Sequence, residues 1–345
     1  MIMERCINLD WLECYCREPR ALDEEYWRAC GYSVAAREYG TPQYHDVLTL
    51  SLNARPFVEI RRRPLSIIEE GGIFPANACH IRMVNSALYT ADPVGDFLRF
   101  LARHHVRIVN TSRLDVCLDF VLFDNGTDPA LFLRDYFAGL YAKVNQCRFS
   151  AHGIDTWRAR TFHSVKWGSE KSRLTTKMYC KTLELATIKD KPYIRAQWNA
   201  AGFPSNAEVW RIEFSMKSSC KSMMSTETGE MIDLSLQNII SRHDFMALFA
   251  ALYETYFDFR HTLGMIRKDR CPRVPLFDFN VIEGTYKFVD IVMKPDPDRR
   301  ARMMLKYLNE IIADAGAWGL EATWAADELR EVFIKKFQFA RPTSK

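Results

Sequence analysis

The stretch RLDVCLDF at residues 113–120 alternates ionisable and apolar side chains. Successive side chains of a β-strand point to opposite faces. Arg113, Asp115 and Asp119 would therefore share one face of a strand, and the intervening leucine and valine side chains would share the other. The pattern predicts a strand that is apolar on one side and polar on the other.

Two later stretches repeat this alternation, TKMYCK at residues 176–181 and VWRIEF at residues 209–214. The first puts Lys177, Tyr179 and Lys181 on one face of a strand, and the second does the same for Arg211 and Glu213. We predict that the three strands pair into one sheet. On its polar face a tyrosine would lie among carboxylates and cations, a set of groups that suits chemistry on a phosphodiester.

A water-facing sheet surface is the alternative interpretation, because antiparallel sheets often expose one side to solvent. Solvated strands usually carry Thr, Lys, Glu and Gln without order, whereas single acids recur beside arginines here. This order favours a functional site.

The composition is that of a folded globular protein. The chain has 345 residues, of which 48% are hydrophobic and 13% aromatic, enough for a packed core in one large or two smaller domains. No apolar run approaches the ~20 residues that span a bilayer, and the opening MIMERCINLDWLECYC has acids where a signal peptide is apolar. We therefore expect a cytoplasmic protein without a membrane partner.

The net charge of +4 is mild and does not by itself indicate nucleic-acid binding.

Turn-forming clusters separate further strand-like runs at residues 8–16, 47–53, 57–62 and 80–89. Asp92-Pro93 and Asp128-Pro129 each supply an N-cap followed by proline at the first position of a predicted helix. Residues 185–208 are polar and basic and are predicted to form a loop or small insertion. Helical spacing then dominates at residues 243–257, 299–316 and 324–337.

The sequence thus predicts an α+β fold. It would consist of a largely antiparallel sheet with one polar catalytic face and helices on the other, followed by a mainly helical C-terminal region. We place the boundary so that residues 1–235 form the catalytic domain. Residues 236–345 would serve packing, dimerisation or DNA contacts.

The segment WGSEKSRLTTKMYCKTLE at residues 167–184 carries a resemblance. It is similar to the pattern Gly-Ser-x-Lys-Ser, a short spacer, Tyr-x-Lys and a following Glu that marks the trans family of rolling-circle replication initiators, which includes plasmid and filamentous-phage initiators and some conjugative relaxases. Upstream, RLDVCLDF resembles that family's Arg-x-Asp-x-x-x-Asp strand, and downstream, VWRIEF resembles its Arg-x-Glu strand. NLDWLECY resembles its opening strand. The resemblance covers residues 5–220 and rests on the order of these elements.

The resemblance implies an enzyme that nicks one DNA strand at an origin and later rejoins it. A tyrosine attacks the scissile phosphate, which leaves a 5′-phosphotyrosyl intermediate and a free 3′-hydroxyl. Members often have a tyrosine two residues before the glycine of Gly-Ser-x-Lys-Ser, where this chain has Lys166. We therefore assign the nucleophile to Tyr179. The remaining catalytic candidates are Lys181, Arg211 and Glu213.

A divalent cation held by carboxylates would polarise the phosphate, and hard oxygen ligands point to Mg²⁺ or Mn²⁺. The candidate ligands are Asp115, Asp119 and Glu213, and Asp119 could instead orient a cation. A surface salt bridge is the alternative for each acid. None of the eight histidines stands in the His-hydrophobic-His strand by which another class of nicking enzymes binds metal, and the ten cysteines form no CxxC pair. We expect free, mostly buried thiols.

Basic side chains near aromatic residues are the candidates for DNA binding. They are Arg61, Arg63, Arg113, Lys166, Lys171, Arg173 and Lys177. A solvated charged surface is the alternative interpretation for these runs. The basic stretch RHTLGMIRKDRCPR at residues 260–273 suits either phosphate contacts or a solvated connector.

The expected partner is origin DNA, double-stranded with an exposed single strand, together with a host helicase and polymerase. The resemblance also implies a homodimer. Two other functions remain open from the sequence. One is a conjugative or mobilisation relaxase of the same family, with the same chemistry at a transfer origin, and the other is a nucleic-acid-binding protein without catalysis.

Overall fold

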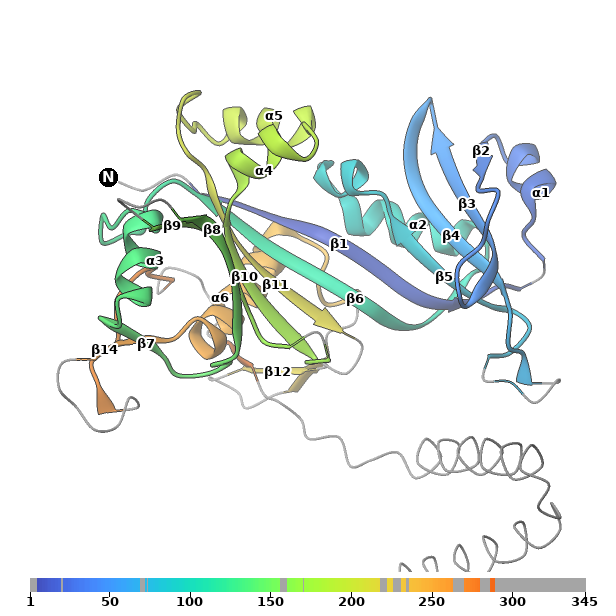
Figure 1. Ribbon diagram of the computed structural model, residues 1–345. Helices are drawn as coiled ribbons and strands as arrows, with labels where there is room; N and C mark the ends of the chain where they lie inside the picture. The colour runs from blue at the N-terminus through green and yellow to red at the C-terminus, as the bar shows by residue number, and fades with distance from the viewer. Residues whose placement is uncertain are drawn as a thin grey trace, which may run out of the picture. The chain divides into compact units, whose positions relative to one another are not determined.

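The computed structural model describes residues 5–19, 21–68, 72, 74–155, 160–169, 171–217, 222–225, 231–233, 236–262, 270–279 and 286–288. Its main feature is a ten-stranded antiparallel sheet in the order β2-β3-β4-β5-β1-β6-β11-β10-β9-β8. Strands β1 (Arg5–Arg17) and β6 (Arg107–Phe120) are the long central pair. Figure 1 shows them running between the part of the sheet that holds β3, β4 and β5 and the part that holds β8 to β11.

The remaining strands of this sheet flank that pair. On one side are β2 (Ser33–Ala36), β3 (Tyr44–Leu52), β4 (Arg55–Pro64) and β5 (Ala78–Met83). On the other are β11 (Trp210–Lys217), β10 (Leu174–Cys180), β9 (Arg160–Trp167) and β8 (Phe149–Asp155). Strand β11 is the latest of the ten in the sequence, yet it lies between β6 and β10. The central part of the sheet is therefore completed by the strand that comes last in the sequence, β11.

Smaller elements accompany the sheet. Two strands, β7 (Tyr141–Lys143) and β14 (Phe259–His261), pair with each other, and β12 (Ser222–Ser225) pairs with β13 (Met231–Asp233) and β15 (Tyr286–Phe288). The helices are α1 (Glu24–Ala29), the 3-10 helix η2 (Asn85–Tyr89), α2 (Pro93–Arg103), α3 (Pro129–Phe137), α4 (Lys181–Thr187), α5 (Pro192–Ala200) and α6 (Arg242–Tyr256).

Two helix starts form as predicted. The Asp92 side chain accepts a hydrogen bond from the Gly95 backbone N–H at 3.0 Å, and Asp128 accepts from Ala130 at 2.8 Å. In both cases proline follows the cap, where its missing N–H costs the helix nothing. Both caps are therefore confirmed.

One continuous core joins the helices to the apolar face of the sheet. Its buried side chains include Leu9, Leu12, Val116, Leu118, Ile212 and Phe214 from the central strands and Phe97, Leu133 and Leu248 from α2, α3 and α6. Helix α6 packs against β1 and β6. Burying this face fixes the strand register, because a shift by one residue would turn the polar side chains into the core. The predicted α+β class with a largely antiparallel sheet is confirmed.

Three local features of the structure were not predicted. Residues 80–89 were expected as one strand, but β5 ends at Met83 and η2 follows. Residues 185–208 were expected as a loop or small insertion without a helix of its own being named, and α5 forms there because Pro192 starts it and Ile194 and Trp198, four positions apart, are both buried. The hairpin of β8 and β9 was not predicted. The described part of the chain has nine cysteines, all free.

The chain divides into two compact units, Met1–Asp290 and Ile291–Lys345. The second unit, with the predicted helices at 299–316 and 324–337, lies outside the described residues. The boundary at residue 235 stays a prediction. Of the helices that are described, none is long and apolar enough to cross a membrane.

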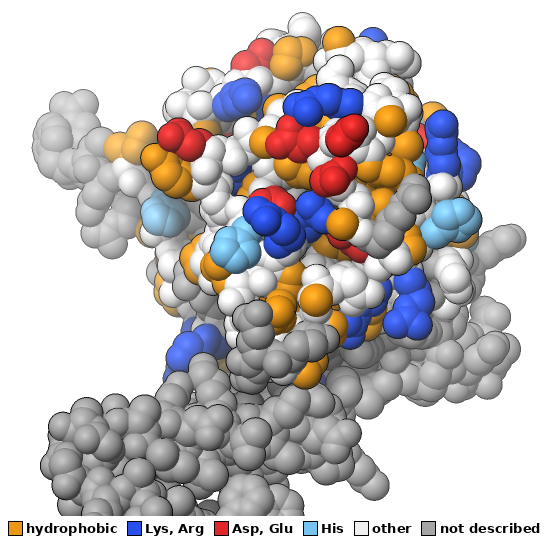
Figure 2. Space-filling view, turned by 90° about the vertical axis from the view of Figure 1, so that its right-hand side faces the viewer, with side chains coloured by type: hydrophobic (Ala, Val, Ile, Leu, Met, Phe, Trp, Pro, Cys, Tyr) orange, Lys and Arg blue, Asp and Glu red, His pale blue; other side chains and the backbone are white. Residues whose placement is uncertain are grey.

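Acidic and basic side chains are interspersed on the side of the sheet that carries α1 and β2 (Figure 2). Arg63 is paired with Asp46 at 2.6 Å and Arg28 with Glu24 at 2.5 Å. This face is therefore not a uniformly basic surface.

Candidate active site

The three predicted strands pair as neighbours, in the order β6-β11-β10. Tyr179 of β10 lies opposite Arg211 of β11, which lies opposite Asp119 of β6. One row along, Lys177 lies opposite Glu213. We call the side of the sheet that carries these residues the polar face. The predicted gathering of a tyrosine with carboxylates and cations is confirmed.

The polar face is not a solvated surface. The exposed fractions are 0% for Asp119, 0% for Arg211, 3% for Glu213 and 2% for Asp115. Charged groups are almost never buried to this extent unless they are paired. The alternative interpretation of a water-facing sheet is therefore wrong for these four residues.

The Tyr179 hydroxyl lies between the carboxylate of Glu213 and the ammonium of Lys181. Its hydroxyl donates a hydrogen bond to Glu213 Oε2 at 3.0 Å, and Lys181 Nζ donates to the same hydroxyl oxygen at 3.3 Å. Lys181 is also paired with Glu184 at 2.7 Å. Glu213 accepts further hydrogen bonds on Oε1 from Lys177 at 3.2 Å and from the Ser215 hydroxyl at 3.3 Å.

Lys181 reaches Tyr179 from a helix rather than from the strand. The predicted strand 176–181 ends at Cys180, which caps α4, and Lys181 is the first residue of that helix. The helix turns the chain back, so the Lys181 ammonium lies 5.2 Å from the centre of the Tyr179 ring. The side chain is 1% exposed.

Electrostatics keep the tyrosine protonated at rest. Burial and the nearby Glu213 carboxylate raise the pKa of Tyr179 well above its ordinary value, against the opposing effect of Arg211. Burial, followed by Arg211, lowers the pKa of Lys181. The phenol therefore needs a base to remove its proton, and Glu213 is the carboxylate that already accepts it.

Arg211 is the centre of a second, deeper network. Its guanidinium donates two hydrogen bonds to Asp119, from Nε at 2.5 Å and from Nη2 at 2.8 Å, and a third to Asp10 at 2.7 Å. Trp198 of α5 donates its indole N–H to Asp119 Oδ2 at 2.7 Å. Both Asp119 oxygens are thus in use. Although burial opposes it, Arg211 lowers the pKa of Asp10 well below its usual range, and Lys181 adds to this effect.

Asp10, Tyr89 and Asn85 are not among the residues that the strand alternation predicts. Asp10 accepts hydrogen bonds from the Tyr89 hydroxyl at 3.0 Å and from Asn85 Nδ2 at 3.2 Å. It reaches the polar face at a register shift between Leu9 and Trp11, where β1 carries one extra residue against β6. The one signal available was its place in the opening strand NLDWLECY.

Asp115 forms the other end of the site. Arg113 donates to both of its oxygens, at 2.9 and 2.5 Å. Burial raises the pKa of Asp115 to about 7, with the Arg113 hydrogen bond opposing and Glu213 adding. Ser215, which lies opposite Asp115, also donates to Glu213. The two carboxylates are therefore electrostatic neighbours.

The predicted metal ligands fit a cation unequally. Glu213 and Asp115 are buried acids, and burial and the nearby Glu213 charge raise the pKa of Asp115, an effect that a bound cation opposes. Asp119 accepts hydrogen bonds from the fully buried Arg211 and from Trp198, whereas the cations paired with Asp115 and Glu213, Arg113 and Lys177, are partly exposed and can be displaced more easily. Within the described residues, no group of three or more His, Cys, Asp and Glu side chains is arranged to hold a metal ion.

The predicted DNA-binding residues fall into two groups. Lys166 of β9 lies opposite Lys177 of β10, next to Tyr179 on the polar face. Arg113 is half-exposed beside Asp115. The other four lie on different parts of the sheet: Lys171 and Arg173 follow β9 in an exposed turn, and Arg61 and Arg63 belong to β4, where they are paired with Glu59 at 3.0 Å and with Asp46.

The described residues of the Gly-Ser-x-Lys-Ser segment, Gly168, Ser169, Lys171 and Ser172, lie between β9 and β10. Gly168 has a φ of +91°, which favours glycine. The Ser172 hydroxyl accepts from the Ser169 backbone N–H at 3.0 Å and closes the turn. The turn lies at the start of β10, and Tyr179 near its end. These serines therefore shape the hairpin and do not contact the tyrosine.

Comparison of the chain with protein-family models and with curated proteins gives no match. Among solved structures it is similar to one described as the rolling circle replication initiator protein from Geobacillus stearothermophilus. The identity is 12%, the TM-score is 0.46, and the match covers 79% of this chain and 92% of that one. Similarity at this level does not assign the chain to a family.

Proposed function

We propose that this protein is a rolling-circle DNA replication initiator that nicks one strand at an origin, with Tyr179 as the nucleophile. The observation that carries this proposal is the position of the Tyr179 hydroxyl, 3.0 Å from a carboxylate oxygen of Glu213 and 3.3 Å from the ammonium of Lys181. A hydroxyl between an acceptor and a cation is the arrangement that an activated nucleophile needs. The order of sequence motifs supports the same reaction.

The nicking step would proceed as a transesterification. As the Tyr179 oxygen forms a bond to phosphorus, Glu213 takes the phenolic proton. The bond from phosphorus to the 3′-oxygen breaks, and the leaving oxygen takes a proton from solvent water to become a free 3′-hydroxyl. Lys181 stabilises the charge that develops on the phenolic oxygen. Because the phosphotyrosyl bond replaces the broken phosphodiester, attack by a 3′-hydroxyl can later restore the strand.

Arg211 would act by its fixed place beside Tyr179, and Asp119 would act by holding Arg211 there. Arg211 lies opposite Tyr179, and Asp119 and Asp10 hold its guanidinium in one orientation. A rigid buried cation beside the nucleophile favours negative charge in the transition state without reorganisation. We therefore assign Asp119 to orienting Arg211.

We further propose that Glu213 and Asp115 bind Mg²⁺ or Mn²⁺. When bound, the cation would polarise the scissile phosphate and neutralise charge on its oxygens. Lys177 and Arg113, which contact these acids, would move toward the DNA phosphates. The proposed partners are origin DNA with an exposed single strand, host helicase and polymerase, and a second copy of this chain. A relaxase would differ in its cognate DNA and not in this chemistry.

The test is a nicking assay on supercoiled plasmid that carries the neighbouring DNA of the protein's own genetic element. Wild-type protein with Mg²⁺ should give relaxed circles and a covalent protein–DNA adduct on a denaturing gel, whereas Tyr179→Phe should give neither. The matched control is Tyr39→Phe, which removes a hydroxyl from a side chain that is 76% exposed and should still nick. Adduct formation by Tyr179→Phe would reject this nucleophile. Tight DNA binding without nicking by the wild type would favour a binding protein without catalysis.

A further inference from the structure

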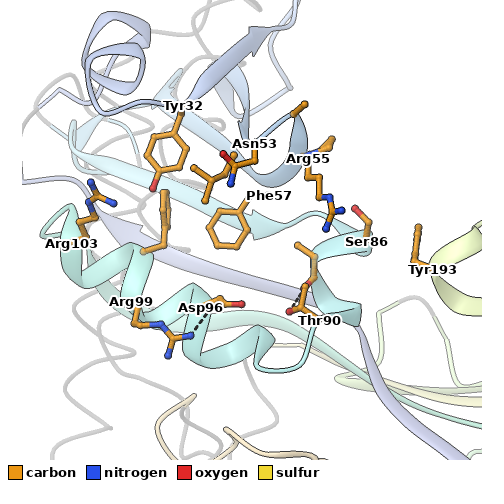
Figure 3. Close-up of a pocket in the computed structure, with 15 residues that line it drawn as sticks. Tyr32, Asn53, Arg55, Phe57, Ser86, Thr90, Asp96, Arg99, Arg103 and Tyr193 are labelled. Carbon is orange, nitrogen blue, oxygen red and sulfur yellow. Dashed lines mark hydrogen bonds and ion pairs between the residues drawn. The ribbon is translucent and has the colours of Figure 1, made fainter. Parts of the chain in front are cut away.

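A groove of about 920 Å³ lies on the molecule outside the candidate active site (Figure 3). Its walls come from the hairpin between β3 and β4, from α2 and from η2, and Tyr193 of α5 lies at one end. Its volume is within the ~300–1,000 Å³ that ligand sites usually have. None of the residues assigned to the nicking chemistry lines it.

The groove has unpaired positive charge at its rim. Arg99 is neutralised by Asp96 at 2.5 Å and by Asp92 at 3.0 Å. Arg55 and Arg103 are exposed, and within the described residues neither forms an ion pair. Because the carboxylates of Asp92 and Asp96 are paired with Arg99, the charge that is left for a ligand is that of the Arg55 and Arg103 guanidinium groups. This favours an anionic occupant, and guanidinium groups bind phosphate especially well.

The floor of the groove is aromatic. Phe57 is half-buried, and Figure 3 shows its ring in the middle of the groove between Tyr32 and Arg55. Phe100 packs edge-on against Phe57, with ring centres 5.5 Å apart, and against Tyr32 at 5.9 Å. This packing fixes the Phe57 ring. A fixed aromatic ring with cations on both sides is the combination that holds the bases and phosphates of a single strand.

The groove is connected to the active site by hydrogen bonds. Tyr193 donates to Asn85 Oδ1 at 2.7 Å, and Asn85 donates to Asp10. Asp10 in turn accepts from Arg211. Ser86 and Thr90, which line the groove, flank the residues of η2 that make these contacts. A strand leaving the polar face over η2 and α5 would thus enter the groove.

We propose that this groove binds a segment of single-stranded DNA that flanks the nicked phosphate, with a base on Phe57 and phosphates on Arg55 and Arg103. The proposal rests on the proposed function for the identity of the strand. It adds a second contact to the substrate, away from the reacting tyrosine. Binding there would hold the strand in place while the broken ends are apart.

The test measures DNA binding in a Tyr179→Phe background, so that no cleavage occurs. Fluorescence anisotropy with a labelled oligo-dT strand is recorded over a series of salt concentrations. The Arg55→Ala/Arg103→Ala variant should bind more weakly, and the slope of log affinity against log salt should shrink by about 1.4, or about 0.7 for each phosphate contact. Phe57→Leu should lose about 5- to 150-fold in affinity with an unchanged slope. Arg134→Ala, which removes an exposed arginine of α3, is the matched control and should change neither quantity.

An unchanged affinity and salt slope in the double arginine variant would overturn the proposal. A Glu-rich peptide with one phenylalanine is the competing probe, and tighter binding of this peptide, lost in the same variants, would assign the groove to a protein partner instead. The nicking assay separates this inference from the proposed function. If the wild type does not nick but the groove variants still lose DNA affinity, the groove proposal stands and the nicking proposal falls.

Discussion

Removing the Asp119 carboxylate should destabilise the protein severely. In Asp119→Ala, the guanidinium of Arg211 keeps Asp10 but loses two hydrogen bonds at a site where the arginine is 0% exposed. The indole N–H of Trp198 also loses its acceptor. Breaking a buried ion pair by removing one partner costs about 3–5 kcal/mol of unfolding free energy. That is a large part of the ~5–15 kcal/mol that holds a typical protein folded.

Urea denaturation followed by tryptophan fluorescence measures this loss. The matched control is Asp135→Ala, which removes an acid paired with Arg134 on the surface and should cost under ~1 kcal/mol. The wild type, the single variants Asp119→Leu and Arg211→Met, and the variant with both changes form a double-mutant cycle. Because the double variant leaves neither an unpaired carboxylate nor an unpaired guanidinium between β6 and β11, it should be more stable than the sum of the single losses predicts, by about 1–3 kcal/mol.

A loss of unfolding free energy below ~1 kcal/mol in Asp119→Ala would show that the pair with Arg211 contributes no more than a solvated surface pair. In the cycle, the losses of unfolding free energy in the two single variants could add up to the loss in the double variant. That result would likewise show that the two side chains do not depend on each other. Either result would remove the basis for assigning Asp119 to the orientation of Arg211.

Three further predictions concern the base, a buried histidine and the metal. Glu213→Gln should lower the single-turnover nicking rate by about 10²–10⁴-fold and leave oligonucleotide binding in place, and an unchanged rate would exclude Glu213 as the base. Burial lowers the pKa of His104, which lies 2.8 Å from the Tyr26 hydroxyl, so its neutral form is favoured in the folded state. Stability should therefore be full above the unfolded pKa of ~6.5 and fall as the pH drops from there toward 5, and His104→Phe should flatten this fall in urea titrations at each pH. Mg²⁺ at 100 times its Kd should stabilise the wild type by about 2.7 kcal/mol in thermal-shift assays. The Asp115→Asn/Glu213→Gln variant should show no such gain, and an equal gain would place the cation elsewhere.

The sequence predicts the central strands well because their alternation is regular. Residues 113–120 and 209–214 have apolar side chains at every second position, and burial of that face leaves one possible register. The hairpin of β8 and β9 escapes prediction because both of its faces are mixed: in β9, Val165 and Trp167 are buried while His163, on the same side, is not. A pattern without a clear period gives no strand signal.

The candidate site is predicted only as far as it lies on regular strands. Tyr179, Arg211 and Glu213 follow from alternation and pairing. Asp10 does not, because its position depends on an extra residue in β1 and its partner is 201 residues away in the chain. Lys181 is brought to the tyrosine by a turn into a helix, which alternation cannot show. Contacts of this kind are set by tertiary structure.

The position of β11 in the centre of the sheet has a consequence for synthesis of the protein. Asp10 and Asp119 leave the ribosome long before Arg211, and at ~5–20 residues per second the first of them waits about 10–40 s for its cation. Once they are made, β6 and later β10 each have an unpaired edge until β11 follows, and this edge can pair with another nascent chain. We expect newly made protein to aggregate in this interval unless a chaperone covers these edges. A chain that stops before Trp210 contains Tyr179, Asp10 and Asp119 but lacks Arg211 and Glu213, so it cannot assemble the site.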